Sequence, residues 1–178
     1  MTDSENLSAS MPERQASQTV TPDWDPVKPI PIDGVRVKDV KNLVIRGGTL
    51  TEIYRPEWFQ DEFQVQHVVH ISALPGYTSQ WHCHHEQSDI IFPIRGYVRI
   101  GLYDARKHSP TCGKSLVATF NLLRPRYVVV PPGVWHALRN IGVDEASYLV
   151  LNDKPFYYEK PDDWLLPAGS DDIPVRLD

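Results

Sequence analysis

From Val35 onward the chain is a series of short apolar runs separated by turn residues. Each run is rich in Val, Ile, Tyr or Phe and ends at or near Gly, Pro, Asn or Asp, which is typical of β-strands. The runs cover residues 41–48, 64–76, 88–96, 97–105, 115–122, 126–133 and 146–153. No segment keeps a 3.6-residue apolar period over three turns, as an amphipathic helix would. The pattern therefore predicts an all-β fold, a sandwich or a barrel.

The 178 residues predict one domain over residues 23–178, with a barrel core at about 35–155. Residues 1–22 are rich in Ser, Thr, Glu and Gln, which predicts a disordered tail. The proline-rich residues 23–34 are expected to be extended. Residues 159–178 are expected to form an irregular tail that packs Trp164 and Leu165 back on the barrel.

Charge and composition exclude several classes of protein. The net charge is −5 and no run of lysine or arginine stands out, which argues against nucleic acid and anionic membranes as partners. No apolar stretch approaches 18 residues, and the polar, acidic N-terminus does not resemble a signal peptide. The two cysteines are too few for a disulfide framework, so we expect a cytoplasmic protein.

The stretch "WHCHHEQSD", residues 81–89, concentrates histidines beside acids. On a strand, His82 and His84 point to one face, and Asp89 opens the next strand. His136 follows another strand and a tight turn, which an antiparallel barrel can bring beside the first pair. Two chemistries are open for this cluster. One is proton transfer; the other is a divalent metal site of His82, His84, Asp89 and His136 holding Fe, Mn, Ni or Zn.

The spacing resembles the two motifs of the cupin superfamily, whose fold is a jelly-roll β-barrel. The first is matched by Gly76, His82, His84, Asp89 and Gly96, and the second by Pro131, Gly133, His136 and Asn140. Asp89 stands where glutamate is usual, and Pro125 where the second motif usually begins with glycine. In cupins, residues at the positions of the three histidines and Asp89 commonly bind one metal ion.

A second resemblance is to the dTDP-4-dehydrorhamnose 3,5-epimerases within that superfamily. It covers roughly residues 35–175 and is carried by Asp104, Arg106, Ser109, Pro110, Thr111 and Gly113, by Gly48, Leu50 and Glu52, and by "FYYEKPDDW". It implies a nucleotide-sugar substrate, His82 as base oriented by Asp171 or Asp172, and His136 or Tyr157 assisting. It also implies substrate contacts from Glu52, Arg46, Arg106 and Trp135. A homodimer that exchanges N-terminal strands is the implied assembly.

Three positions depart from that family. Ser79 replaces a phosphate-binding arginine, Asp89 an enolate-stabilising lysine, and Val150 an acid tyrosine. A carboxylate beside an enolate opposes the developing charge unless a cation lies between them. The leading hypothesis is an epimerase or isomerase of nucleotide-linked 4-keto-6-deoxysugars in surface-polysaccharide or deoxysugar synthesis. The alternatives are a metal cupin with oxygenase or Lewis-acid chemistry, and a sugar-binding cupin without catalysis.

Overall fold

The computed structural model describes residues 18, 20–23, 30–60 and 62–178. The predicted disorder of residues 1–22 falls mostly outside this range, as does part of the extended segment 23–34. In the described part of the chain, no helix is long and apolar enough to cross a bilayer.

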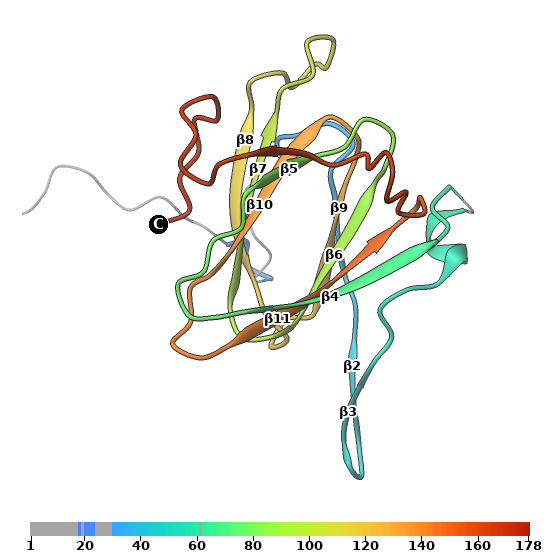
Figure 1. Ribbon diagram of the computed structural model, residues 1–178. Coiled ribbons are helices and arrows are strands. Elements are labelled where there is room, and N and C mark those ends of the chain that lie inside the picture. Colours follow the sequence, from blue (N-terminus) through green and yellow to red (C-terminus); the bar gives the residue numbers. More distant parts are fainter. Residues whose placement is uncertain (1–17, 19, 24–29, 61) are drawn as a thin grey trace, which may run out of the picture.

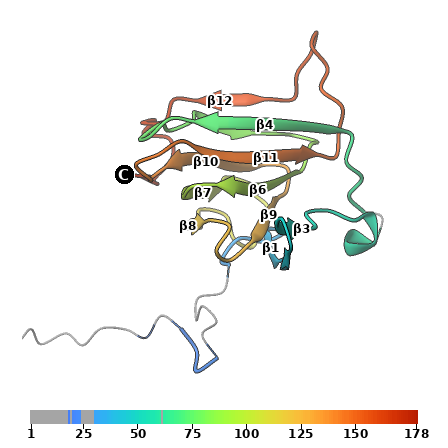
Figure 2. The same ribbon diagram turned by 90° about the horizontal axis from the view of Figure 1, so that it is seen from below.

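Two five-stranded antiparallel sheets face each other and form a barrel (Figures 1 and 2). The first has the order β1-β9-β6-β11-β4, and the second β12-β5-β10-β7-β8. The predicted all-β cupin fold is confirmed. The strands are β1 Arg36–Asp39, β2 Asn42–Ile45, β3 Gly48–Thr51, β4 His67–Ala73, β5 Trp81–Cys83, β6 Asp89–Arg95, β7 Val98–Asp104, β8 Ser115–Phe120, β9 Arg126–Val130, β10 Val134–Asn140, β11 Ala146–Asn152 and β12 Trp164–Leu166; one 3-10 helix, η2, spans Pro56–Phe59.

Each of the predicted runs contains a strand. Several strands are apolar at consecutive positions because both faces of each sheet are covered. Side chains such as Ile91, Ile100 and Leu138 fill the interior between the sheets. Phe59 and Phe63 cover the outer face of the first sheet. The C-terminal residues 173–177 cover the outer face of the second sheet.

The prediction that Trp164 and Leu165 pack back on the barrel is wrong, since their side chains are 56% and 46% exposed. These residues belong to β12, which pairs with β5 through the backbone at the edge of the second sheet. The buried residues of the tail are instead Ile173, Val175 and Leu177, which cluster with Trp81 and Ala137. Alternate residues of an extended chain share a face, and that face covers the second sheet.

The turn between β9 and β10 places His136 in the barrel. Gly133 has φ +78°, and a Cβ there would lie 2.6 Å from Cγ of Arg106, so glycine is required. Strand β10 then starts at Val134, and its register puts His136 opposite His82 of β5. A hairpin of β2 and β3 projects away from the barrel (Figure 1).

Candidate active site

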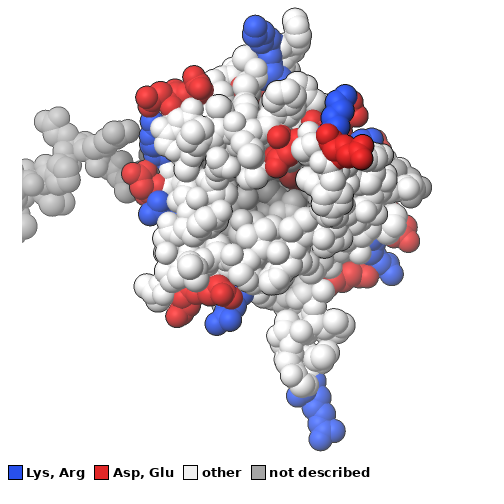
Figure 3. Space-filling view, in the orientation of Figure 1, with Lys and Arg blue, Asp and Glu red and all other residues white. Residues whose placement is uncertain are grey.

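A cavity of about 700 Å³ opens between the two sheets and appears as a hollow in the surface (Figure 3). The strand registers bring its polar residues to one level of the barrel. On the first sheet Asn152 lies between His67 and Asp89, and on the second His82 lies opposite His136. Below this level the wall is apolar, formed by Val69, Ile71, Ile91, Leu138 and Val150. The cavity thus has a reactive polar layer above an apolar floor.

His82 is paired with a carboxylate. Its Nδ1 lies 2.9 Å from Oδ1 of Asp163, which immediately precedes β12. A carboxylate accepts, so Nδ1 carries a proton and Nε2 is left as the basic nitrogen of a neutral ring. Burial opposes ionisation of Asp163, but the His82 hydrogen bond outweighs it and lowers the pKa of Asp163. This pair can hold a base in one tautomer and stabilise the imidazolium that forms when it takes a proton.

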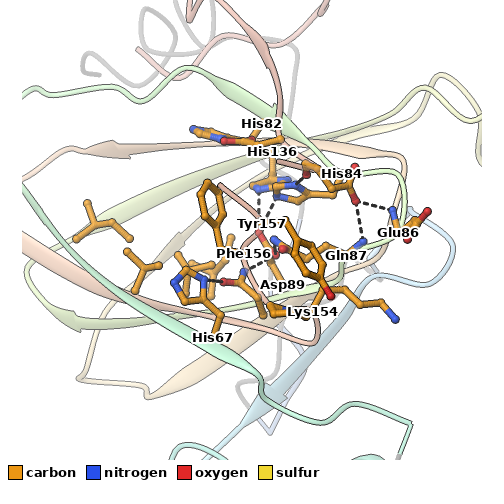
Figure 4. A pocket seen from close by; sticks show the side chains of 18 of the residues that line it. His67, His82, His84, Glu86, Gln87, Asp89, His136, Lys154, Phe156 and Tyr157 are labelled. Atoms are coloured by element: carbon orange, nitrogen blue, oxygen red, sulfur yellow. Dashed lines mark hydrogen bonds and ion pairs between the residues drawn. The ribbon is translucent and has the colours of Figure 1, made fainter. Parts of the chain in front are cut away.

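Asp89 forms the centre of a buried cluster (Figure 4). Its Oδ2 lies 3.2 Å from Nε2 of His84 and 3.3 Å from Nε2 of His136. Its Oδ1 accepts N–H bonds from the amides of Gln87 and Asn152, both at 2.8 Å. Burial alone would raise the pKa of Asp89, but the bonds from His136 and His84 lower it far below its usual range. Asp89 is therefore an ionised carboxylate.

The cluster requires a positive charge. Nδ1 of His84 faces the Asp162 carbonyl, and Nδ1 of His136 lies 3.2 Å from the Val134 carbonyl, so both Nδ1 atoms carry protons. In neutral rings both Nε2 lone pairs would then point at the same carboxylate oxygen. Burial disfavours a charged His84, but the bond and charge of Asp89 prevail and raise the pKa of His84 to about 9. A proton or a metal ion must therefore lie between these atoms.

We expect the free energy of unfolding, in the presence of a chelator, to fall as pH rises from about 6.5 to about 9. The pKa of His84 in the folded state, about 9, lies above the ordinary histidine pKa of about 6.5, so its contribution is complete below about 6.5 and is lost as pH rises through about 9. This pKa shift corresponds to a loss of about 3 kcal/mol in the free energy of unfolding. Urea unfolding at several pH values measures it. A His84→Gln variant should flatten the dependence; an unchanged slope in that variant would contradict the assignment.

The same three residues fit a divalent metal ion. One ligand atom from each of His84, Asp89 and His136 lies within 4.8 Å of the other two. Metal bonds of 2.0–2.2 Å place neighbouring ligands about 3.0–3.4 Å apart, which matches the two nitrogen–oxygen distances. Protonated Nδ1 atoms leave both Nε2 atoms as ligands, as is usual for metal-bound histidine. His82, predicted as a fourth ligand, lies outside this group because its ring is turned to Asp163.

Asp162 holds the loop that carries the cluster. Its carboxylate accepts the backbone N–H groups of His85, Glu86 and Gln87, at 2.9, 2.7 and 3.1 Å. Burial opposes ionisation, but these three bonds lower the pKa of Asp162. Since its carbonyl also binds His84, one residue positions both His84 and the loop leading to Asp89.

Several residues predicted for the site lie elsewhere. Asp171 is exposed and pairs with Arg176 at 3.1 Å, so the carboxylate that contacts His82 is Asp163 and not Asp171 or Asp172. Trp135 alternates with His136 on β10 and so points to the outer face, where it lines a separate depression with Arg106. The Arg106 guanidinium is bound to Asp104 at 2.8 Å. These two residues cannot touch a ligand held by His82 of the same chain.

The other predicted site residues lie either in the cavity or in and beside the β2–β3 hairpin. Tyr157 lines the cavity at its mouth and is 65% exposed (Figure 4). Arg46 lies in the turn of the β2–β3 hairpin, and Glu52 follows β3 and pairs with Arg55 at 2.8 Å. Neither lines the cavity of its own chain.

Comparison with known proteins identifies the family. No protein-family model matches the chain. A probable low-salt glycan biosynthesis epimerase of Haloferax volcanii is 31% identical over 138 residues, covering 76% of this chain and 88% of that protein. The chain belongs to the dTDP-4-dehydrorhamnose 3,5-epimerase-like family of cupins. A spore coat polysaccharide biosynthesis protein of Bacillus subtilis, 28% identical over 145 residues, covers 80% of this chain and 93% of its own length.

Solved structures share the epimerase fold. A dTDP sugar isomerase from Desulfovibrio desulfuricans has a TM-score of 0.75 at 22% identity, covering 82% of this chain and 91% of that one. A 3′-monoepimerase from Streptomyces bikiniensis, solved with dTDP-quinovose, has a TM-score of 0.73 at 19% identity, covering 83% and 76%. At these identities the likeness concerns the fold alone.

Sequence reasoning missed five residues that shape this epimerase site. They are His67, Gln87, Asn152, Asp162 and Asp163. A usable signal existed for Asp163, since it precedes "WLL", a short apolar run that was interpreted as irregular. The amides of Gln87 and Asn152 carry no such signal, because only the fold places them beside Asp89.

Proposed function

We propose that this chain epimerises or isomerises a nucleoside-diphosphate-linked 4-keto-6-deoxysugar for a surface polysaccharide or deoxysugar pathway. The observation that carries the proposal is the His82–Asp163 pair in the wall of a cavity. The relatives support the substrate class: the Streptomyces monoepimerase was solved with dTDP-quinovose, and a Bacillus anthracis 3,5-epimerase with TDP. The two free cysteines, Cys83 and Cys112, are consistent with a cytoplasmic setting.

The chemistry follows from the ketone. A 4-keto group acidifies the hydrogens on C3 and C5, and Nε2 of His82 removes one of them. Asp163 holds the ring and balances the imidazolium charge. The developing enolate would be opposed by an unbalanced carboxylate, and the protonated His84, with His136 in the same cluster, balances the charge of Asp89, which stands in place of the lysine.

Deuterium exchange tests this proposal. The protein would be incubated in D₂O with a panel of nucleoside-diphosphate-linked 4-keto-6-deoxyhexoses, and deuterium at C3 and C5 followed by NMR. We expect incorporation at one or both carbons in at least one substrate. An absence of exchange across the panel rejects the proposal, and saturable binding without exchange would then favour a sugar-binding cupin.

A second candidate function is that of a metal-dependent cupin, favoured by the geometry of His84, Asp89 and His136. These residues would hold one Fe, Mn, Ni or Zn ion. When bound, such an ion with open positions supplies Lewis-acid polarisation of a ketone or binding of oxygen. The same residues would keep their roles of positioning and charge balance.

Metal content decides between the two candidates. If the second is correct, protein purified without an affinity tag should contain about one metal ion per chain, and His84→Ala should lose it. The matched control is His85→Ala, because His85 is exposed beside Trp164 and its side chain is outside the cluster. Emission spectrometry of all three proteins measures the metal content per chain. Equal metal in wild type and His84→Ala, or none in wild type, would reject the metal function.

We infer that the protein acts as a homodimer in which the β2–β3 hairpin contacts the second copy. An isolated two-stranded hairpin is marginal in water. This one exposes apolar side chains: Leu43, Val44, Ile45 and Leu50. Lys154 is the only lysine or arginine among the described residues that line the cavity, so a diphosphate needs another cation. Arg46, in the turn at the tip of this hairpin, is the candidate that a partner would supply.

The assembly prediction is tested by sedimentation. Wild type should be a dimer at micromolar concentration, and Val44→Asp should shift it toward monomer, because Val44 is 83% exposed in one chain and would be covered in a dimer. Val143→Asp, at a 90% exposed loop position away from the hairpin, is the control. A wild-type monomer at this concentration contradicts the homodimer.

A further inference from the structure

His67 is a second imidazole in the cavity, on the wall that faces His82. It opens β4, and its side chain points inward with Val69 and Ile71. Strand β4 belongs to one sheet and β5, which carries His82, to the other. Figure 4 shows His67 on the side of the cavity away from His82. A ligand between the sheets therefore has one histidine on each face.

Hydrogen bonds assign the protons of His67. Asp89 accepts from Nδ2 of Asn152 at 2.8 Å, which fixes the orientation of that amide. Oδ1 of Asn152 then faces Nδ1 of His67 at 3.1 Å, so Nδ1 carries a proton and donates it. No described residue makes a hydrogen bond to Nε2 of His67. The ring is held against Phe156, with centroids 5.9 Å apart, and Nε2 is free for a ligand.

Inversion at a carbon requires removal of a proton from one face and delivery to the other. The other inward-facing side chains of β4, β6 and β11 are poorly placed to deliver it. Val69 and Val150 carry no exchangeable proton, and Asp89 is an ionised carboxylate that already contacts four side chains. Tyr148 lies two inward positions along β11 from Asn152, away from the level of His82.

We propose that His67 is the catalytic acid that returns a proton to the face opposite His82, an inference that rests on the proposed function. Nε2 of His82 takes the proton next to the ketone, and the C–H electron pair becomes part of the enolate. The enolate carbon then takes a proton from Nε2–H of the His67 imidazolium, which inverts that carbon. His82 releases its proton to solvent and His67 regains one from solvent, so no other reactant is consumed.

The test separates exchange from inversion in D₂O. In His67→Gln, His82 still removes a proton and returns a deuteron to the same face. We expect the rate of inversion to fall at least about 100-fold, while deuterium exchange with retained configuration stays within about tenfold of wild type. His67→Ala supplemented with imidazole should regain inversion, which a purely structural role would not allow. His70→Gln is the control, because His70 lies on the same strand but points outward and is exposed.

The outcomes identify which idea fails. Wild-type inversion rates in His67→Gln overturn the role of His67 and leave the proposed function standing. Loss of exchange and inversion together in His67→Gln, without imidazole rescue of His67→Ala, also overturns it, because His67 would then act on fold or binding. If wild type neither exchanges nor inverts any sugar of the panel, the proposed function fails and His67 loses its role with it.

Discussion

Replacing His82 by Gln should reduce deuterium exchange and turnover by about 10²–10⁴-fold, the usual contribution of a positioned general base. Gln fills a similar volume but cannot take up a proton from carbon. The loss should appear in exchange itself, since the variant cannot form the enolate. His84 and His136 share the carboxylate of Asp89, whereas His82 is paired with a separate carboxylate, that of Asp163.

Two further variants sharpen this experiment. Asp163→Asn should also reduce exchange, because an amide can donate to Nδ1 and favour the wrong tautomer of His82. His85→Gln should leave exchange unchanged, because its exposed side chain packs on Trp164 outside the cavity. If His82→Gln keeps exchange within tenfold of wild type, another group is the base and the proposed mechanism is wrong.

The second large effect concerns stability. Asp89→Leu should lower the free energy of unfolding by about 3–5 kcal/mol, the typical cost of removing one partner of a buried charge pair. The substitution leaves the donors of Gln87 and Asn152 and both Nε2 atoms, of His84 and His136, without their acceptor. An unpaired buried donor costs more than its hydrogen bond contributed.

Urea unfolding at about pH 6.5 with a chelator measures this loss. Asp171→Leu is the matched control, because Asp171 is fully exposed and its pair with Arg176 contributes little. A change below about 0.5 kcal/mol is expected there. If Asp89→Leu costs less than about 1 kcal/mol, the cluster does not hold the barrel together, and its role would be confined to chemistry.

Much of the barrel followed from local pattern. The apolar runs and their Gly and Pro turns predicted the strands, because strand formation and turn chemistry depend on neighbouring residues. Alternation correctly put His82 and His84 on one face, and Cys83 between them is buried on the outer face. The resemblance implied a substrate contact for Trp135, but residues 134–140 form a strand. Once β10 is known, its alternation with His136 puts it outside the cavity.

The sequence by itself determined the fold class, and the spacing of its two motifs predicted that His84, Asp89 and His136 gather in one site. Only the tertiary structure decided which groups each histidine meets. Asp163 reaches His82 from 81 residues away through the pairing of β12 with β5. His67 reaches Asn152 from 85 residues away through β4 and β11. Such pairings depend on sheet register, which is set by the packing of the whole barrel and not by local residues.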